Sequence, residues 1–140
     1  MNIYALQQRY SVDPAREAIL NGIHVLESEL DSYMCGYQEG FSFIVNNLMP
    51  TIRKRWCIAY LLSRTFLNTD VSKPVVLAHF SKECDSKENT LAMAVLMPST
   101  SVNTVIEKHG VTSITDIAII FGVSKLVVVE RLKQKNVLFV

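Results

Sequence analysis

The chain has 140 residues, of which 49% are apolar and 19% are charged, with 14 Lys and Arg against 13 Asp and Glu. This length is typical of one domain spanning residues 1–140. The apolar content excludes a disordered chain and leaves room for an apolar binding surface. A net charge of +1 excludes a global field that would attract nucleic acid or an anionic membrane.

The three cysteines, Cys35, Cys57 and Cys84, are an odd number without a CxxC pair. This pattern favours reduced thiols over a disulfide framework or a structural zinc site. The N-terminus has no basic segment followed by an apolar run, and no apolar stretch reaches roughly 18 residues. We therefore expect a soluble, cytoplasmic protein that does not enter a membrane.

The first half of the chain predicts a helix, a hairpin and a second helix. Asp13 and Pro14 are typical of a helix start, and the apolar spacing after them predicts a helix that ends near Leu30. Residues 32–47, SYMCGYQEGFSFIVNN, contain two aromatic and β-branched runs broken at residues 38–40, which predicts an antiparallel hairpin. Pro50 then precedes a predicted central, buried helix, whose apolar face comprises Ile52, Trp56, Ala59, Leu62 and Phe66.

The second half adds a short strand and further helices. KPVVLAHF, residues 73–80, predicts a third strand, and KENTLAMAVLMP predicts a helix that Pro98 ends. Ser99 or Ser101 is expected to cap a helix over about residues 102–108. Residues 112–138 predict two helices joined at FGVS. The sum is an α+β fold with five or six helices around a small sheet that contains antiparallel strands.

The central helix has the outline of a zinc-peptidase helix without its chemistry. In an HExxH helix, two histidines at i and i+4 bind Zn²⁺ and the intervening Glu activates a water molecule. Here RWCIAYLLSR has Tyr60 at the first histidine, Leu61 at the general base and Arg64 at the second histidine. Arg64 has no lone pair to give a metal, and Leu61 cannot accept a proton. We therefore expect no zinc hydrolysis at this helix.

Four segments together resemble the ImmA/IrrE family of zinc-peptidase-like (DUF955-type) proteins, from about residue 32 to residue 138. They are YMCGYQEGFSFIVNN, RKRWCIAYLLSR, DSKENTLAMAVLMP and DIAIIFGVSKLVVVERL, in that order. The resemblance implies a small zincin-like domain that ends in a helix-turn-helix-like pair. Asn46, Ala59 and the Leu-Met-Pro at residues 96–98 match the family's scaffold.

The departures from the family pattern concentrate at the zinc site. Asp85 stands where the family has its third ligand, a Glu, and Asn89 stands at the family's Asn. The vestigial active-site positions are thus Tyr60, Leu61, Arg64, Asp85 and Asn89. One hypothesis is that a salt bridge between Arg64 and Asp85 replaces the metal as the tie between two helices. The alternative is that the two side chains face solvent separately.

The resemblance implies a pseudo-metallopeptidase that regulates by protein contact. ImmA-like proteins occur in bacteria and their mobile elements, where they act on a helix-turn-helix repressor and control lysogeny or transfer. A member without zinc ligands would bind a repressor or another regulator, as an antirepressor for example, without cofactor or catalysis. An exposed FSFIV strand edge would add a peptide strand. The expected partner cleft contains Phe41, Phe43, Val45, Tyr60, Arg64 and Asp85.

Two other functions stay open. The last two helices also fit a DNA-binding helix-turn-helix, although the basic residues, Lys125, Arg131, Lys133 and Lys135, lie mostly late in the second helix. The second open function is a residual metallopeptidase with an unrecognised site. His79, Cys84 and Asp85 lie close enough in sequence to suggest a relocated site or a Cys-His pair.

The remaining candidates favour structural roles. His24 and His109 are isolated, on a predicted helix and at a helix end, and are expected to be surface or core groups. The apolar residues 137–140 are expected to add a strand to the sheet or to contact another chain, including a second copy of the protein.

Overall fold

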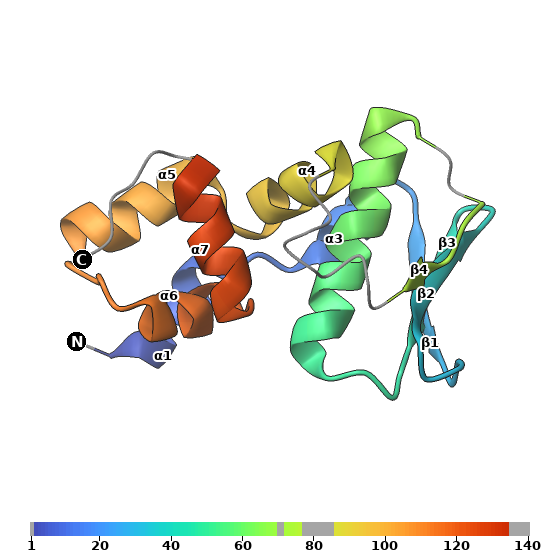
Figure 1. Cartoon of the computed structure of the whole chain (residues 1–140), viewed down its shortest axis with the longest axis horizontal. Helices are drawn as coiled ribbons and strands as arrows, with labels where there is room; N and C mark the ends of the chain where they lie inside the picture. The colour runs from blue at the N-terminus through green and yellow to red at the C-terminus, as the bar shows by residue number, and fades with distance from the viewer. Residues whose placement is uncertain (1, 70–71, 77–85, 135–140) are drawn as a thin grey trace.

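A four-stranded mixed sheet lies at one end of the molecule and a group of helices at the other (Figure 1). The computed structural model describes residues 2–69, 72–76 and 86–134. In chain order the elements are α1 (Ile3–Tyr10), α2 (Pro14–Leu20), β1 (His24–Ser28), β2 (Met34–Glu39), β3 (Ser42–Asn46), α3 (Thr51–Leu67), β4 (Val75–Val76), α4 (Lys87–Leu96), α5 (Ser99–Asn103), the π-helical η2 (Thr104–Lys108), α6 (Ile114–Phe121) and α7 (Lys125–Gln134). The predicted α+β class is confirmed.

The N-terminal region differs from the prediction. α1 is not predicted from the sequence; the side chain of Asn2 caps it by accepting from the N–H of Tyr4. Asp13 caps α2 as expected, but the helix ends at Leu20, and its predicted extension to Leu30 is wrong. Gly22 turns the chain with a φ of +78°, and the next residues form β1 because their backbone pairs with β3.

The sheet has the strand order β1-β3-β2-β4. The predicted hairpin is confirmed as β2 and β3, and β1 lies parallel to β3 on the other side. β4 pairs antiparallel with β2 and comprises only Val75 and Val76 of the predicted third strand, whose residues 77–80 lie outside the described part.

α3 packs on one face of the sheet and is the central helix that the sequence predicts (Figure 1). Its burial is confined to residues 56–64, so Ile52 and Phe66 of the predicted apolar face are exposed instead. β2 comes very close to α3 at Gly36, where a Cβ atom would lie 2.7 Å from the sulfur of Cys57. Only glycine permits this approach.

The helical end largely follows the prediction. α4 packs along α3 and ends before Pro98, and α6 and α7 form the expected pair. The predicted serine cap is wrong, because Pro98 is the N-cap of α5 and Ser99 is already helical. α1 packs against α6, which closes this end of the core. None of the described helices combines the length and the hydropathy that crossing a membrane requires.

Candidate functional site

Three of the positions predicted to form a vestigial zinc site lie in the buried middle of α3. Tyr60 and Arg64 are one helical turn apart, and Leu61 is completely buried in the hydrophobic core. An aliphatic side chain in that place has no atom that can take a proton from water. The local sequence folds this way because α3 lies between the sheet and α4, so its middle residues contact protein on both sides.

Arg64 points into the protein, with only 5% of the residue exposed. Its Nη1 donates a hydrogen bond to the backbone carbonyl of Lys73, just before β4. Its guanidinium carbon lies 4.9 Å from the centre of the Tyr60 ring, where the electron-rich face of the ring attracts the cation. Arg64 and Tyr60 thus form an internal contact that ties α3 to the segment leading into β4.

The expected partner of Arg64 lies outside the described residues. Asp85 is among residues 77–85, and so are His79 and Cys84 of the suggested relocated site. The Arg64 to Asp85 salt bridge stays a prediction. Among the described carboxylates, none lies within ion-pair distance of Arg64.

Asn89 is buried in the first turn of α4, the helix that packs along α3. Its backbone N–H donates to the side-chain oxygen of Ser86 at 3.1 Å, so Ser86 caps the helix. The structure therefore places Asn89 on the helix that packs along α3, and α3 carries Tyr60 and Arg64. Asn89 has little access to solvent.

Four of the six residues of the predicted partner cleft are buried, because Tyr60 and Arg64 are each only 5% exposed and Phe43 and Val45 less still. Phe43 and Val45 are completely buried against α3, so their side chains cannot contact another molecule. β3 is not a sheet edge either, because β1 and β2 flank it on both sides. The error follows from the helix predicted over residues 24–28, which form the strand that covers this edge. Phe41, in the turn before β3, is 79% exposed.

The described thiols are protonated core groups. Cys35 and Cys57 are both buried and unoxidised, on β2 and α3. Burial raises the pKa of the Cys57 thiol strongly, with a further contribution from Cys35 nearby, and burial likewise raises the pKa of Cys35. Burial and a raised pKa both disfavour the thiolate that nucleophilic attack needs.

The two described histidines are far apart in the fold. His24 lies on β1 and not on the expected helix, and His109 follows η2, where its Nε2 lies 3.1 Å from the hydroxyl of Tyr10. In the described part of the chain, no group of three His, Cys, Asp or Glu side chains is arranged to hold a metal ion.

The C-terminal pair of helices uses its main basic residue internally. Arg131 is 8% exposed, and its guanidinium donates to the carbonyl of Met97 at 2.9 Å and to Ser99 Oγ at 3.0 Å. It therefore holds α7 against the junction of α4 and α5 and cannot reach DNA. Lys125 and Lys133 are exposed, and Lys135 lies outside the described residues. Arg131 is therefore not available for the DNA contact that the helix-turn-helix alternative would need from the second helix.

The outer face of the sheet is an apolar surface that is not predicted above. Leu26, Ile44 and Tyr37 lie side by side on three neighbouring strands, on the face opposite to Phe43 and Val45. The consecutive apolar residues of β3, Phe43, Ile44 and Val45, were a signal that both faces of this strand are apolar, because successive side chains point to opposite faces. The lack of any Lys or Arg between residues 21 and 52 was a second signal.

Comparisons with known proteins did not identify a relative of this chain. No protein-family model, no curated protein and no solved structure matches this chain. Its relation to the ImmA/IrrE proteins stays a prediction from the four sequence segments.

Proposed function

We propose that the chain is a catalytically inactive ImmA/IrrE-like regulator of bacterial, phage or mobile-element origin. It binds a helix-turn-helix repressor or another regulator protein in the cytoplasm and changes the activity of that partner by contact alone. Transcription or lysogeny is the process under control, with the chain acting as an antirepressor or in a related role.

The contact of Arg64 with Tyr60 and with the Lys73 carbonyl is the observation that supports this proposal most. A permanent guanidinium at a ligand position repels a divalent cation by about 4 kcal/mol per unit charge at roughly 4 Å and an effective dielectric near 20. The Arg64 side chain also occupies the position of a metal ligand, where it donates its own hydrogen bond to the Lys73 carbonyl. The vestigial site is therefore a structural tie between α3 and β4.

The exposed surface of the protein is the part that is available to bind a partner. The core residues at the former site are buried, whereas exposed apolar side chains gather around the sheet, among them Leu26, Tyr33, Phe41 and Leu48. Exposed apolar groups that lie close together are typical of a protein contact. A pseudo-peptidase that has kept its fold and lost its ligands would act through such a surface.

The test is affinity capture of the tagged full chain from the cells that produce it, followed by mass spectrometry and metal analysis of the same eluate. A stoichiometric, intact DNA-binding regulator without stoichiometric zinc is the expected result. Stoichiometric zinc or a cleaved partner would overturn the proposal. An Arg64→His variant is the matched control for adventitious metal, because it restores one potential ligand while Leu61 still blocks catalysis.

A further inference from the structure

The outer face of the sheet is an apolar surface that no described helix covers. α3 packs against the inner face, and Figure 1 shows the helices on that side of the strands. The strand register aligns Leu26 of β1, Ile44 of β3 and Tyr37 of β2 in one row across the outer face. Leu26 is 52% exposed, so this row contacts solvent in the isolated chain.

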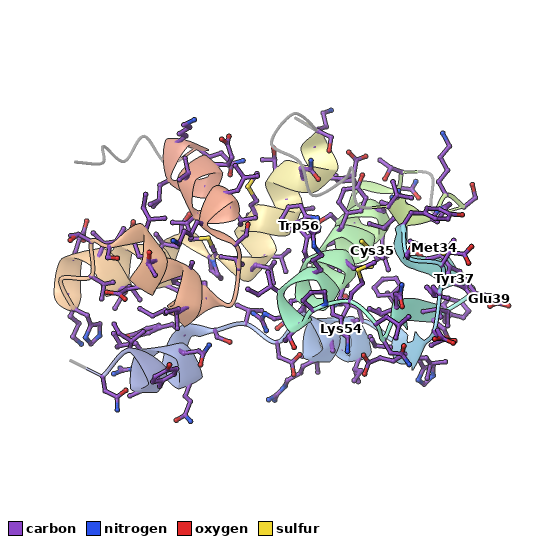
Figure 2. All side chains as sticks on the ribbon, turned by 60° about the horizontal axis from the view of Figure 1, so that its bottom comes forward. Met34, Cys35, Tyr37, Glu39, Lys54 and Trp56 are labelled. Carbon is purple, nitrogen blue, oxygen red and sulfur yellow. The ribbon has the colours of Figure 1, made fainter. Side chains whose placement is uncertain are left out.

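A shallow hollow of about 600 Å³ continues this row beyond the ends of the strands. Its lining includes the apolar side chains of Met34, Tyr37 and Leu48 and the carboxylates of Glu29 and Asp31. Figure 2 shows Tyr37 and Glu39 at the sheet end of the molecule, on the side away from α3. The hollow thus combines an aromatic ring with two anionic groups, which suits a Lys or Arg side chain.

The charge of this region is entirely negative. Residues 21–52 contain four carboxylates, Glu27, Glu29, Asp31 and Glu39, and neither Lys nor Arg. Glu27 faces α3, where it pairs with Lys54 at 2.6 Å. The other three are exposed and make no ion pair with any described residue. Glu39 is two residues from Tyr37 on the same strand and so lies on the outer face as well.

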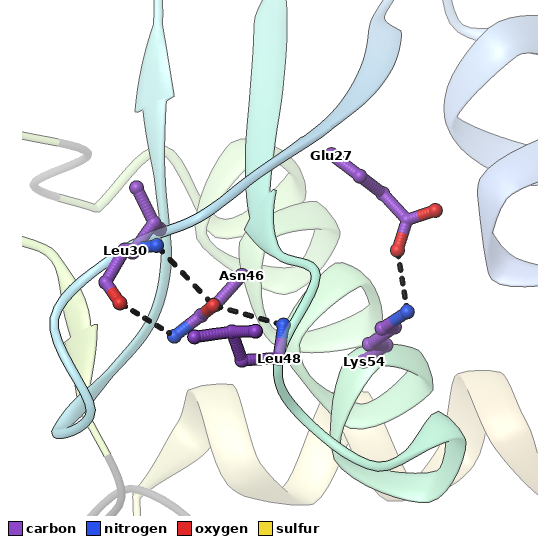
Figure 3. Close-up of polar contacts among 5 residues, drawn as sticks. All are labelled: Glu27, Leu30, Asn46, Leu48 and Lys54. Atoms are coloured by element: carbon purple, nitrogen blue, oxygen red, sulfur yellow. Dashed lines mark hydrogen bonds and ion pairs between the residues drawn. The ribbon is translucent and has the colours of Figure 1, made fainter.

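Asn46 holds the loop that carries two of these carboxylates (Figure 3). Its side-chain oxygen accepts from the N–H of Leu30 at 3.3 Å, as Figure 3 shows. Its amide also donates to the carbonyls of Asp31 and Met34 at 3.2 and 2.9 Å. Because the side chain is completely buried, these bonds are shielded from water. The loop over residues 29–33 is therefore positioned by the core, which fixes the hollow before any partner arrives.

We infer that the outer sheet face docks a cationic amphipathic helix of a DNA-binding regulator. The apolar side of that helix packs on the row of Leu26, Ile44 and Tyr37, and one of its Lys or Arg side chains enters the hollow between Glu29 and Asp31. Charge complementarity selects this occupant over a neutral or an acidic one. The inference rests on the proposed function and identifies the surface of this chain that binds the partner. A regulator contacts DNA phosphates through cations, so the carboxylates would compete with DNA for the same residues.

A synthetic helix provides the first test. The probe is a fluorescent peptide of about 18 residues in which Leu forms one helical face and Lys the other, and its partner in the comparison has Glu in place of every Lys. We expect the Lys peptide to bind the full chain at least about tenfold more tightly than the Glu peptide at low salt, and to weaken as salt rises. Equal binding of the two peptides would overturn the inference in favour of a purely apolar contact.

Surface variants locate the binding. The double variant Glu29→Lys/Asp31→Lys is expected to weaken the Lys peptide by about tenfold or more. Its matched control, Glu88→Lys/Glu107→Lys, changes net charge equally on α4 and η2 and should stay within about twofold of the original chain. Equal losses in the two double variants would overturn the site, because binding would then follow net charge alone. Circular dichroism verifies folding of both.

A second pair of variants tests the apolar contribution. Leu26→Ser removes an exposed apolar side chain from the outer face, and Tyr4→Ser removes an exposed aromatic ring from α1 at the other end of the molecule (Figure 1). Only Leu26→Ser is expected to weaken the peptide, by roughly threefold to tenfold. A concentration-dependent dimer that Leu26→Lys dissociates would assign the face to a second copy of the chain instead.

Captured regulators separate this inference from the proposed function. If the original chain and Glu29→Lys/Asp31→Lys capture the same regulator equally, the proposed function stands and the docking face is wrong. If neither captures a regulator while the peptide results are as expected, the face binds cationic helices and the proposed function is wrong. A regulator that only the original chain captures supports both.

Discussion

The helical end and the sheet end of the molecule satisfy their buried polar groups in different ways. At the helical end two arginines reach from one helix to the backbone of another: Arg55 of α3 donates to the carbonyls of Phe121 and Gly122, and Arg131 of α7 donates to that of Met97. At the sheet end the corresponding tie is the neutral amide of Asn46 (Figure 3). Buried cations thus join the helices at the closed end, whereas a neutral group holds the loop over residues 29–33 at the open end, where the cation of Arg64 ties only α3 to the segment before β4.

This difference matters for binding. Because the loop at the sheet end is held without a buried cation, its carboxylates keep their charge for a partner. The helical end has its cations occupied by carbonyls, and burial lowers the pKa of both Arg55 and Arg131. The buried arginines of the helical end therefore make their contacts within the fold. The three carboxylates of the sheet end that pair with no described residue face solvent.

Replacing Asn46 is expected to have the largest effect on stability. Asn46→Ala leaves several buried backbone groups of residues 30, 31, 34 and 48 without partners, which should lower the free energy of unfolding by about 3 kcal/mol. Urea denaturation measures this loss. The exposed neighbour supplies the control, because Asn47→Ala should change stability by less than about 0.5 kcal/mol. A loss below about 1 kcal/mol for Asn46→Ala would mean that water replaces the amide in the loop.

Removing the arginine of α7 tests the other end. Arg131→Ala leaves the Met97 carbonyl without its donor and should cost about 2 kcal/mol, measured by the same denaturation. Arg131→Lys should recover less than half of that loss, since an ammonium cannot reach two acceptors at the angle of a guanidinium. Lys133→Ala, on the exposed side of α7, is the control. Equal small losses for Arg131→Ala and Lys133→Ala would show that the buried contact is dispensable.

Much of the fold follows from local patterns in the sequence. The hairpin of β2 and β3, the helix α3 and the pair of α6 and α7 each have a periodicity or a turn that specifies them locally. The strand β1 does not. Its residues, HVLES, form a strand because their backbone pairs with β3. That pairing is a long-range contact, which local patterns in a single sequence do not predict.

The candidate site shows a similar limit. The residue types at positions 60, 61 and 64 argue against zinc chemistry without any structure. The direction of the Arg64 side chain, toward Tyr60 and a backbone carbonyl, depends on where β4 lies. The burial of Phe43 and Val45 depends on which face of the sheet α3 covers, because alternation along a strand separates two faces without saying which is inside.

The buried thiol between the sheet and α3 should make the sheet end sensitive to alkaline pH. Burial raises the pKa of Cys57, so above about pH 8.5 the unfolded chain loses this proton while the folded chain retains it. Stability from the protonated thiol is therefore full below the unfolded pKa and falls as pH rises beyond it. The slope difference between the original chain and Cys57→Ala should approach about 1.4 kcal/mol per pH unit.

Denaturation series at several alkaline pH values give this slope for both proteins. Cys57→Ala is itself less stable because it leaves a cavity, so the comparison uses slopes and not absolute values. Parallel pH profiles would contradict the prediction and would mean that the thiolate is accommodated in the fold. Slow reaction of both described thiols with a thiol reagent under native conditions provides an independent check.

The smallest effect is expected for the ion pair between Glu27 of β1 and Lys54 of α3 (Figure 3). Glu27→Gln should lower stability by less than about 1 kcal/mol, because partly exposed ion pairs are weak, and the difference should shrink further at about 1 M salt. A double-mutant cycle with Lys54→Met measures the pair itself. Since Glu27 faces α3, Glu27→Gln should also leave binding of the Lys peptide unchanged, whereas Glu39→Gln on the outer face should weaken it. Equal effects of the two substitutions on binding would mean that the sheet end attracts cations through its overall charge, and that its outer face has no special part in recognition.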